Sequence, residues 1–151
     1  MFKNGWYTIE QAEKTKKIGF EILQANKNLK TLYYNAIDCE TSGAYYDNRI
    51  NQTIGAFEGN DGLTNVIFGN KVEVLPEYLL YNCHNVDSLY FPNSIKKIAR
   101  YALHNTEWFN KASNKELIYA NKVAYSYIGK NNTNKMQEHS QMPYNIREKK
   151  E

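Results

Sequence analysis

One stretch of the sequence occurs twice at a fixed spacing. Residues 63–70 (LTNVIFGN) correspond to residues 86–93 (VDSLYFPN), and the correspondence continues as far as Asn82 and Asn105. The two copies are offset by 86 − 63 = 23 residues throughout. A fixed period of about 20–50 residues is typical of repeat proteins, in which each unit buries its apolar face against its neighbours. The repeat therefore predicts a solenoid.

Each copy carries apolar residues at its first, fourth and sixth positions. In the first copy these residues are Leu63, Val66 and Phe68. Alternation along a strand directs these side chains inward and the side chains at the third and fifth positions outward. We expect the strands of successive units to pair in parallel as one sheet, while the second part of each unit returns along the opposite face.

An earlier unit begins near Leu29, which is 63 − 29 = 34 residues before Leu63 and so exceeds the period by 11. The surplus falls in residues 38–51, which are rich in Asn, Gly, Ser and Asp and therefore predict an inserted loop. The repeat region is expected over 29–110, with units at 29–62, 63–85 and 86–108.

The N-terminal segment reads as a helix. Thr8 with Gln11 three positions later forms a capping box, which predicts a helix over residues 8–26. We expect this helix to form an N-terminal helical cap at 1–28.

The C-terminal segment departs from the repeat after Asn105. Two segments rich in aromatic residues flank residues 120–122 (ANK), which predicts a β-hairpin. Terminal units of repeat proteins cover the exposed core, so we expect a C-terminal β-hairpin cap at 111–130. Residues 131–151 are polar, and we expect a poorly ordered tail.

Several of these segments resemble a known family. Residues 63–68 (LTNVIF), 91–95 (FPNSI) and 98–103 (IARYAL) resemble BspA-type leucine-rich repeats, and residues 105–110 with 117–127 resemble the capping segment of bacterial members. Ala99 and Leu103 stand where the family usually has Gly and Phe, but such changes leave the predicted fold intact.

The resemblance implies a fold and a general role. The fold class is a repeat solenoid, α+β and mostly β, in which leucine-rich repeats form a short right-handed coil with an N-terminal helix and a C-terminal hairpin. The role implied is a secreted or cell-surface module that binds a partner, often within a larger adhesin, without catalysis. No functional residues carry over from the family, because binding surfaces vary between its members.

Charge and hydropathy exclude some function classes. The net charge is +3 and the lysines are interleaved with acids, so we expect no nucleic-acid partner. No apolar run is long enough to span a bilayer, and we expect no membrane insertion. The N-terminus shows no signal peptide and we see no anchor in this chain, so a surface location rests on the family resemblance.

The residues offer little chemistry. The two cysteines, Cys39 and Cys83, have no metal-ligand spacing, and the sequence is consistent with either a disulfide or two free thiols. Cys83 beside His84 suggests a Cys–His pair, but a structural role for a small buried residue in a turn is the stronger interpretation. No catalytic motif is present. We therefore predict no catalytic residues, no metal, no cofactor and no enzymatic activity.

The outward positions of the strands are the candidate binding residues. The third and fifth positions place polar side chains beside an apolar stripe that contains two tyrosines. Tyrosine is favoured at recognition surfaces, although such residues can also serve only as cross-strand pairs that stabilise the sheet. We expect this face to bind a protein partner; the alternatives are a glycan bound by the exposed tyrosines, or a structural spacer in a larger surface protein. The predicted residues are Thr31, Tyr33, Asn65, Ile67, Ser88 and Tyr90.

Overall fold

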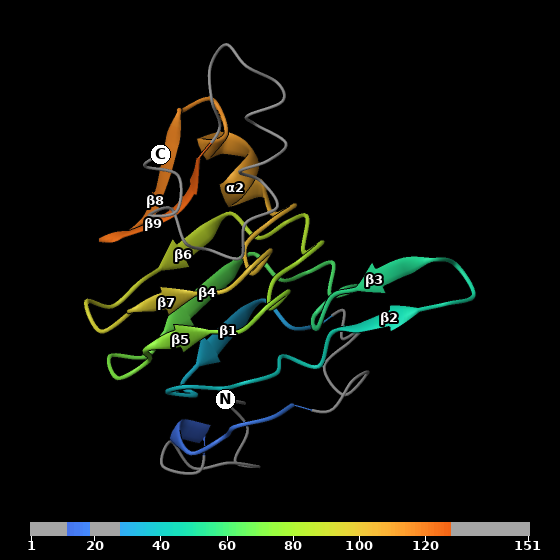
Figure 1. The fold of residues 1–151 in the computed structure, drawn as a ribbon, viewed down its shortest axis with the longest axis horizontal. Helices are drawn as coiled ribbons and strands as arrows, with labels where there is room; N and C mark the ends of the chain where they lie inside the picture. The colour runs from blue at the N-terminus through green and yellow to red at the C-terminus, as the bar shows by residue number, and fades with distance from the viewer. Residues whose placement is uncertain (1–11, 19–27, 128–151) are drawn as a thin grey trace, which may run out of the picture.

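The computed structural model describes residues 12–18 and 28–127, and its repeats stack along one axis (Figure 1). A three-stranded parallel sheet has the order β1-β4-β6, and a second parallel pair joins β5 to β7. The two sheets lie on different sides of the stack, with β5 and β7 in front of β1 and β4 in Figure 1. The strands are β1 (Thr31–Tyr34), β4 (Asn65–Phe68), β5 (Val74–Leu75), β6 (Ser88–Tyr90) and β7 (Lys97–Ile98).

The register of both sheets follows the sequence repeat. Ser88 pairs with Asn65, and Lys97 pairs with Val74, so residues 23 positions apart are neighbours in both sheets. Thr31 pairs with Asn65, which matches the longer offset of the earlier unit. The parallel pairing predicted from the sequence is therefore confirmed.

The core consists of the inward positions that recur from unit to unit. Phe57, Leu80 and Leu103 occupy equivalent places, and each is fully buried. Burial of such a side chain contributes about 1.5–3 kcal/mol. The aromatic ring of Phe68 stacks on that of Phe91 at 5.4 Å between centroids, so apolar contact continues between units. Each unit thus completes the core of its neighbour.

Exposed ion pairs also join successive units. Glu73 pairs with Lys96 at 3.5 Å, and Glu77 with Arg100 at 3.6 Å. Both pairs follow the 23-residue period, because the acid of one unit lies beside the base of the next. Solvent-exposed pairs contribute little to stability, about 0–1 kcal/mol each, so the core sets the stacking.

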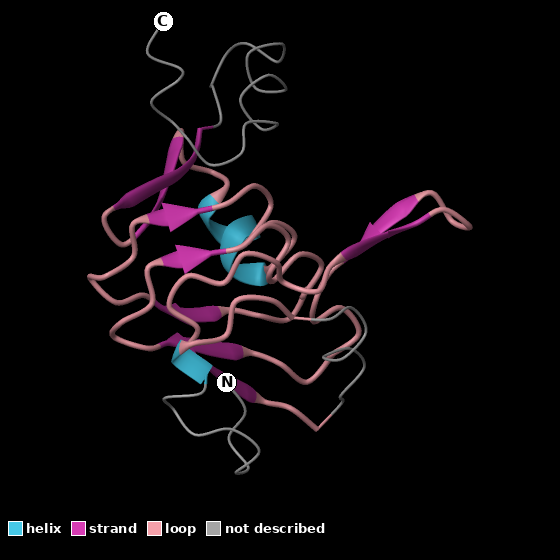
Figure 2. Cartoon of the chain, turned by 60° about the horizontal axis from the view of Figure 1, so that its bottom comes forward, coloured by secondary structure: helices cyan, strands magenta, loops and turns pink. Residues whose placement is uncertain are grey.

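The insertion in the first unit is a β-hairpin, so the prediction of a loop was wrong. Asp38 forms a bridge to Val74, and residues at the start of the predicted insertion therefore belong to the return path. The extra residues form an antiparallel pair that projects from the stack (Figures 1 and 2). Its strands are β2 (Tyr45–Asp47) and β3 (Gln52–Ile54).

Turn chemistry that the loop prediction overlooked closes this hairpin. The Asp47 carboxylate accepts hydrogen bonds from the backbone N–H of Arg49 and from its Nε, both at 2.9 Å. Asn51 adopts the left-handed region with φ of 59°, which asparagine tolerates better than most residues. Polar residues that suggested a loop thus supply a hairpin turn.

The predicted helix over residues 8–26 is wrong for the described residues after Glu13. Ala12 and Glu13 are helical, but Lys17 forms a parallel bridge to Thr41. The Ile18 N–H donates to the Thr41 carbonyl at 3.1 Å, so pairing with the next unit replaces helical hydrogen bonds. Tertiary pairing therefore overrides local helix propensity here. The rest of the predicted N-terminal cap lies outside the described residues.

A short helix, α2 (Glu107–Ala112), stands where another repeat strand would begin. Thr106 causes the change, because its hydroxyl donates to the Leu103 carbonyl at 2.9 Å and accepts from the Phe109 N–H at 3.0 Å. This is the N-cap arrangement that starts a helix. The sequence did not predict α2.

The C-terminal hairpin was predicted correctly. Strands β8 (Leu117–Ala120) and β9 (Val123–Tyr127) pair antiparallel, and Asn121 in the turn has φ of 56°. The Asn121 side chain donates to the Pro92 carbonyl at 3.2 Å, which ties the hairpin to the last repeat. Figure 2 shows the hairpin at one end of the stack. The predicted tail at 131–151 lies outside the described residues.

Both cysteines are buried and free. Of the two alternatives that the sequence left open, two free thiols is therefore correct. Over the described ranges, no helix is long and apolar enough to cross a membrane.

Candidate functional site

The six predicted binding residues lie side by side on the sheet β1-β4-β6. Tyr33 pairs with Ile67, and Ile67 with Tyr90, in one row across the strands. The neighbouring row consists of the polar residues Thr31, Asn65 and Ser88. Adjacent strands are about 4.8 Å apart, so each row forms a continuous strip. We call these six residues the sheet face.

Exposure increases from the centre of this row toward its ends. The side chain of Tyr90 is 57% exposed and that of Tyr33 is 37% exposed, while Ile67 between them is half-buried. Leu32 and Val66 alternate with these residues and are buried. The outward direction predicted from strand alternation is therefore confirmed, and the tyrosine rings present most of the apolar area.

A charged contact borders the sheet face near the start of β6. The Lys111 ammonium lies 2.8 Å from the Asp87 carboxylate and connects α2 to the last repeat. The hydrogen bond to Asp87 raises the pKa of Lys111. An apolar centre with a charged rim is the usual layout of a protein–protein interface.

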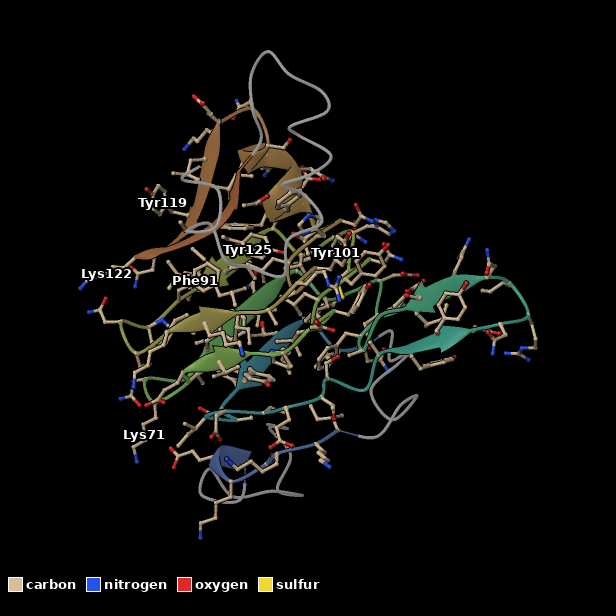
Figure 3. The ribbon with its side chains drawn as sticks, viewed as in Figure 1. Lys71, Phe91, Tyr101, Tyr119, Lys122 and Tyr125 are labelled. Atoms are coloured by element: carbon tan, nitrogen blue, oxygen red, sulfur yellow. The ribbon has the colours of Figure 1, made fainter. Side chains whose placement is uncertain are left out.

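A concave surface lies between the hairpin β2-β3 and the turns of the second and third repeats. Its volume is about 560 Å³. The hairpin contributes Tyr46, Asn51, Gln52 and Thr53, and the repeat turns contribute Tyr78, Tyr81, Asn82, Tyr101 and Asn105. We call this surface the hairpin cleft. Figure 3 shows Tyr101 toward the hairpin and Tyr119 away from it.

Sequence reasoning missed the hairpin cleft. One wall is the hairpin that was predicted as a loop, and the other belongs to the second part of each unit, which was expected only to return along the opposite face. A signal was available, because Tyr78 and Tyr101, and likewise Asn82 and Asn105, recur at the 23-residue period. Large polar side chains at recurring turn positions form a ladder when the units stack.

The suggested Cys–His pair is not an activated nucleophile. Burial and the nearby Glu58 raise the pKa of Cys83 to about 12. A reactive cysteine needs the opposite, a lowered pKa that yields thiolate near neutral pH. The imidazole of His84 is exposed, whereas the thiol is buried. The structural interpretation of Cys83 is the better one.

His104 has a structural environment as well. Its ring stacks on Phe109 with 4.2 Å between centroids, and its Nδ1 lies 2.6 Å from the Tyr125 hydroxyl. Burial lowers the pKa of His104 to about 4. The neutral imidazole thus helps to attach the C-terminal hairpin. His139 lies outside the described residues.

Metal ligands do not gather in the described ranges, where no three His, Cys, Asp or Glu side chains come close enough to hold an ion.

Comparison with known proteins identifies the repeat. A family model described as the BspA type leucine-rich repeat region (6 copies) matches residues 52–145 of the 151-residue chain. No curated protein and no solved structure matches significantly. Strand β1 lies before the matched residues, yet it pairs with β4 in the same parallel arrangement as β4 with β6. The sequence resemblance is therefore confirmed, and the chain belongs to the BspA-type leucine-rich repeat family.

Proposed function

We propose that this chain is a non-catalytic binding module that recognises a protein partner through the sheet face. The repeats form a right-handed solenoid of 23-residue units whose stacked strands hold the binding residues. Leucine-rich repeats are often used for protein interaction, and members of this family are typically found on bacterial cell surfaces. A surface role in adhesion or partner recognition fits both properties.

The observation that carries the proposal is the row Tyr33, Ile67 and Tyr90. These residues lie on neighbouring hydrogen-bonded strands, and both tyrosines are exposed above a packed core. Tyrosine supplies a large rigid contact area and is enriched among the residues that dominate binding energy. Because the strands are fixed, a partner need not order the backbone on binding, which lowers the entropic cost.

The polar row beside these residues can fix the orientation of the bound partner. Thr31, Asn65 and Ser88 stand beside the apolar row and are partly exposed. Hydroxyl and amide groups there can pair with the backbone or side chains of a partner, and such bonds fix orientation. A glycan bound to the same tyrosines, or a spacer role without binding, remains the alternative that experiment must exclude.

Substitution of the two tyrosines tests the proposal. The wild-type chain is applied to a protein array, and the affinity of each protein found is measured for Tyr33→Ala and Tyr90→Ala. Truncation at the centre of an interface costs about 2 kcal/mol or more, so we expect a loss of roughly 30-fold. Tyr46→Ala is the matched control, because Tyr46 is 51% exposed but lies on the projecting hairpin.

The outcomes separate the alternatives. Retained affinity in both sheet-face variants would remove the sheet face as the binding surface. Binding on a glycan array that is lost in Tyr33→Ala or Tyr90→Ala would favour the glycan alternative. An absence of any binding on both arrays would favour the spacer.

A further inference from the structure

The hairpin cleft has a composition unlike the sheet face. Among the described residues that line it, every side chain is neutral, and four of the nine are tyrosines. We propose that the hairpin cleft binds a neutral oligosaccharide. This site is separate from the sheet face, since the two surfaces share no residue.

The charges around the cleft indicate that its ligand is neutral. One carboxylate, that of Glu58, is bonded directly to a cleft residue: its Oε1 accepts from Asn82 Nδ2 at 3.2 Å and from the Gly55 N–H at 2.8 Å. The described residues that line the cleft carry no positive charge to pair with an anionic ligand. The guanidinium of Arg100 lies 6.0 Å from the Tyr101 ring centroid, but it already pairs with Glu77 at 3.6 Å. A buried charge without a partner is costly, so a neutral ligand fits the walls best.

The tyrosines of the repeat turns form a mutually supported group. The ring centroid of Tyr78 lies 5.1 Å from that of Tyr81 and 5.2 Å from that of Tyr101. All three side chains are half-buried, so their positions are fixed by packing before any ligand arrives. Within the described ranges, their hydroxyls form no hydrogen bond. A sugar ring also combines an apolar face with a polar rim, and an amphipathic tyrosine matches both.

The asparagine side chains of the repeat turns form a chain of hydrogen bonds. Asn105 Nδ2 donates to Asn82 Oδ1 at 2.8 Å, and Asn82 Nδ2 donates in turn to Glu58. This chain of bonds orients the Asn105 amide with its oxygen left available. From the hairpin wall, the exposed Gln52 adds a further amide. Amides both donate and accept, which suits the neighbouring hydroxyls of a sugar.

The backbone of the cleft supports a ligand role. Tyr78 and Tyr101 adopt positive φ of 59° and 60°, a conformation that is unusual for a bulky residue. Glycine would accept it without strain, yet in the first unit the equivalent residue, Gly55, does not have a positive φ. Strained residues of this kind are often found at ligand sites, where the side chain is needed.

The same walls argue against a peptide as the occupant. Peptide grooves generally offer apolar pockets for side chains. In the part of the chain that the structure describes, no Leu, Ile, Val or Met lines the hairpin cleft. Side-chain hydroxyls and amides on both walls suit hydroxyl-rich ligands more closely than peptide side chains.

Titration with defined sugars tests the proposal on the full chain. The probes are soluble neutral oligosaccharides of glucose, galactose, mannose and N-acetylglucosamine, together with sialylated and sulfated counterparts. Affinity is measured by calorimetry for the wild type, Gln52→Ala and Tyr46→Ala. Both substitutions are on the exposed hairpin, so the repeats remain folded. We expect at least one neutral probe to bind, and each substitution to weaken it about five- to tenfold.

The control is Tyr119→Ala, which removes an exposed tyrosine from β8, outside both the hairpin cleft and the sheet face, and should leave sugar binding unchanged. The proposal is overturned if no neutral probe binds, if charged probes bind more tightly, or if the two hairpin substitutions have no effect. Capture of library peptides in the cleft, lost in Gln52→Ala, would also overturn it. The sheet face is tested by Tyr33→Ala and Tyr90→Ala with a protein partner, and the hairpin cleft by Gln52→Ala and Tyr46→Ala with sugars, so either proposal can fail alone.

Discussion

The hydroxyl of Tyr125 on β9 lies 2.6 Å from Nδ1 of His104 in the last repeat turn. The same hydroxyl accepts a hydrogen bond from the backbone N–H of Leu103 at 2.9 Å. Tyr125 is buried, and Figure 3 shows it between the hairpin and the repeats. One side chain of the cap therefore completes the hydrogen bonding of the final repeat.

Tyr125→Phe tests this attachment. The substitution keeps the ring but leaves the Leu103 N–H without its acceptor in a buried site. We expect the free energy of unfolding to fall by about 1–3 kcal/mol, as measured by urea denaturation. The control is Tyr119→Phe on the neighbouring strand, where the side chain is 54% exposed and little change is expected. Equal stability of Tyr125→Phe and the wild type would show that the contact is not needed.

His104 makes stability depend on pH in a defined direction. Burial lowers its pKa from an ordinary 6.5 to about 4. Between these two pH values His104 is therefore protonated in the unfolded chain and neutral in the folded chain. The contribution of His104 to the free energy of unfolding is fully present above pH 6.5. It falls as the pH decreases toward 4 and then levels off, with a total loss of about 3 kcal/mol. The measurement is the free energy of unfolding between pH 7 and pH 4 in the wild type and in His104→Gln.

Other groups also titrate between pH 4 and pH 7, so the effect of His104 is obtained from the difference between the wild-type and His104→Gln profiles. We expect the pH dependence to be shallower in His104→Gln. His84→Gln serves as the control for the loss of an imidazole, because His84 is exposed and its side chain should contribute little to the free energy of unfolding. Identical profiles for the wild type and His104→Gln would contradict the assignment.

Asn105 tests the left-handed turn of the repeat. Its φ is 60°, and the equivalent residue of the first complete turn is Gly59, with φ of 89°. Asn105→Ala should lower the free energy of unfolding by about 1–2 kcal/mol, because alanine disfavours this conformation. Asn105→Gly relieves the backbone and should lie closer to the wild type in thermal unfolding. Equal destabilisation by both changes would mean that the side-chain contact to Asn82, rather than the backbone, sets the cost.

Gly55 is expected to be intolerant of any side chain. A Cβ there would lie much closer to the Tyr81 carbonyl oxygen than van der Waals contact allows, and this oxygen belongs to the backbone of the next turn. Gly69→Ala is the comparison, because its Cβ would meet the side-chain oxygen of Asn35, which can rotate away. We expect Gly55→Ala to lower the melting temperature substantially more than Gly69→Ala. The reverse order would show that the two turns do not approach as closely as described.

Much of the architecture could be predicted because the repeat encodes it directly. The inward positions, such as Val66, must pack between neighbouring units, and their spacing is visible in the sequence. The outward row of Tyr33, Ile67 and Tyr90 follows from the same alternation. The C-terminal hairpin was predictable because Asn121 is a favourable residue for a left-handed turn between two apolar segments.

What escaped prediction depends on partners that are distant in sequence. The segment around Lys17 has helical periodicity, but its backbone bonds to residues near Thr41. Residues 38–51 have loop composition, yet Asp47 and Asn51 use that polarity to close a hairpin. The hairpin cleft needs both this hairpin and the stacked turns, so no local pattern could reveal it. Local propensity fails where tertiary pairing provides the hydrogen bonds.

The central claim is that a partner rests on the sheet face, and photo-crosslinking from single positions tests it most directly. Benzoylphenylalanine is introduced at Tyr33 or Tyr90 on the sheet face, and separately at Tyr46 on the hairpin and Tyr119 on β8. With the protein partner found on the array, we predict crosslinks from positions 33 and 90 and none from position 46. A partner that crosslinks from position 46 while positions 33 and 90 stay unlinked would contradict the proposed binding surface.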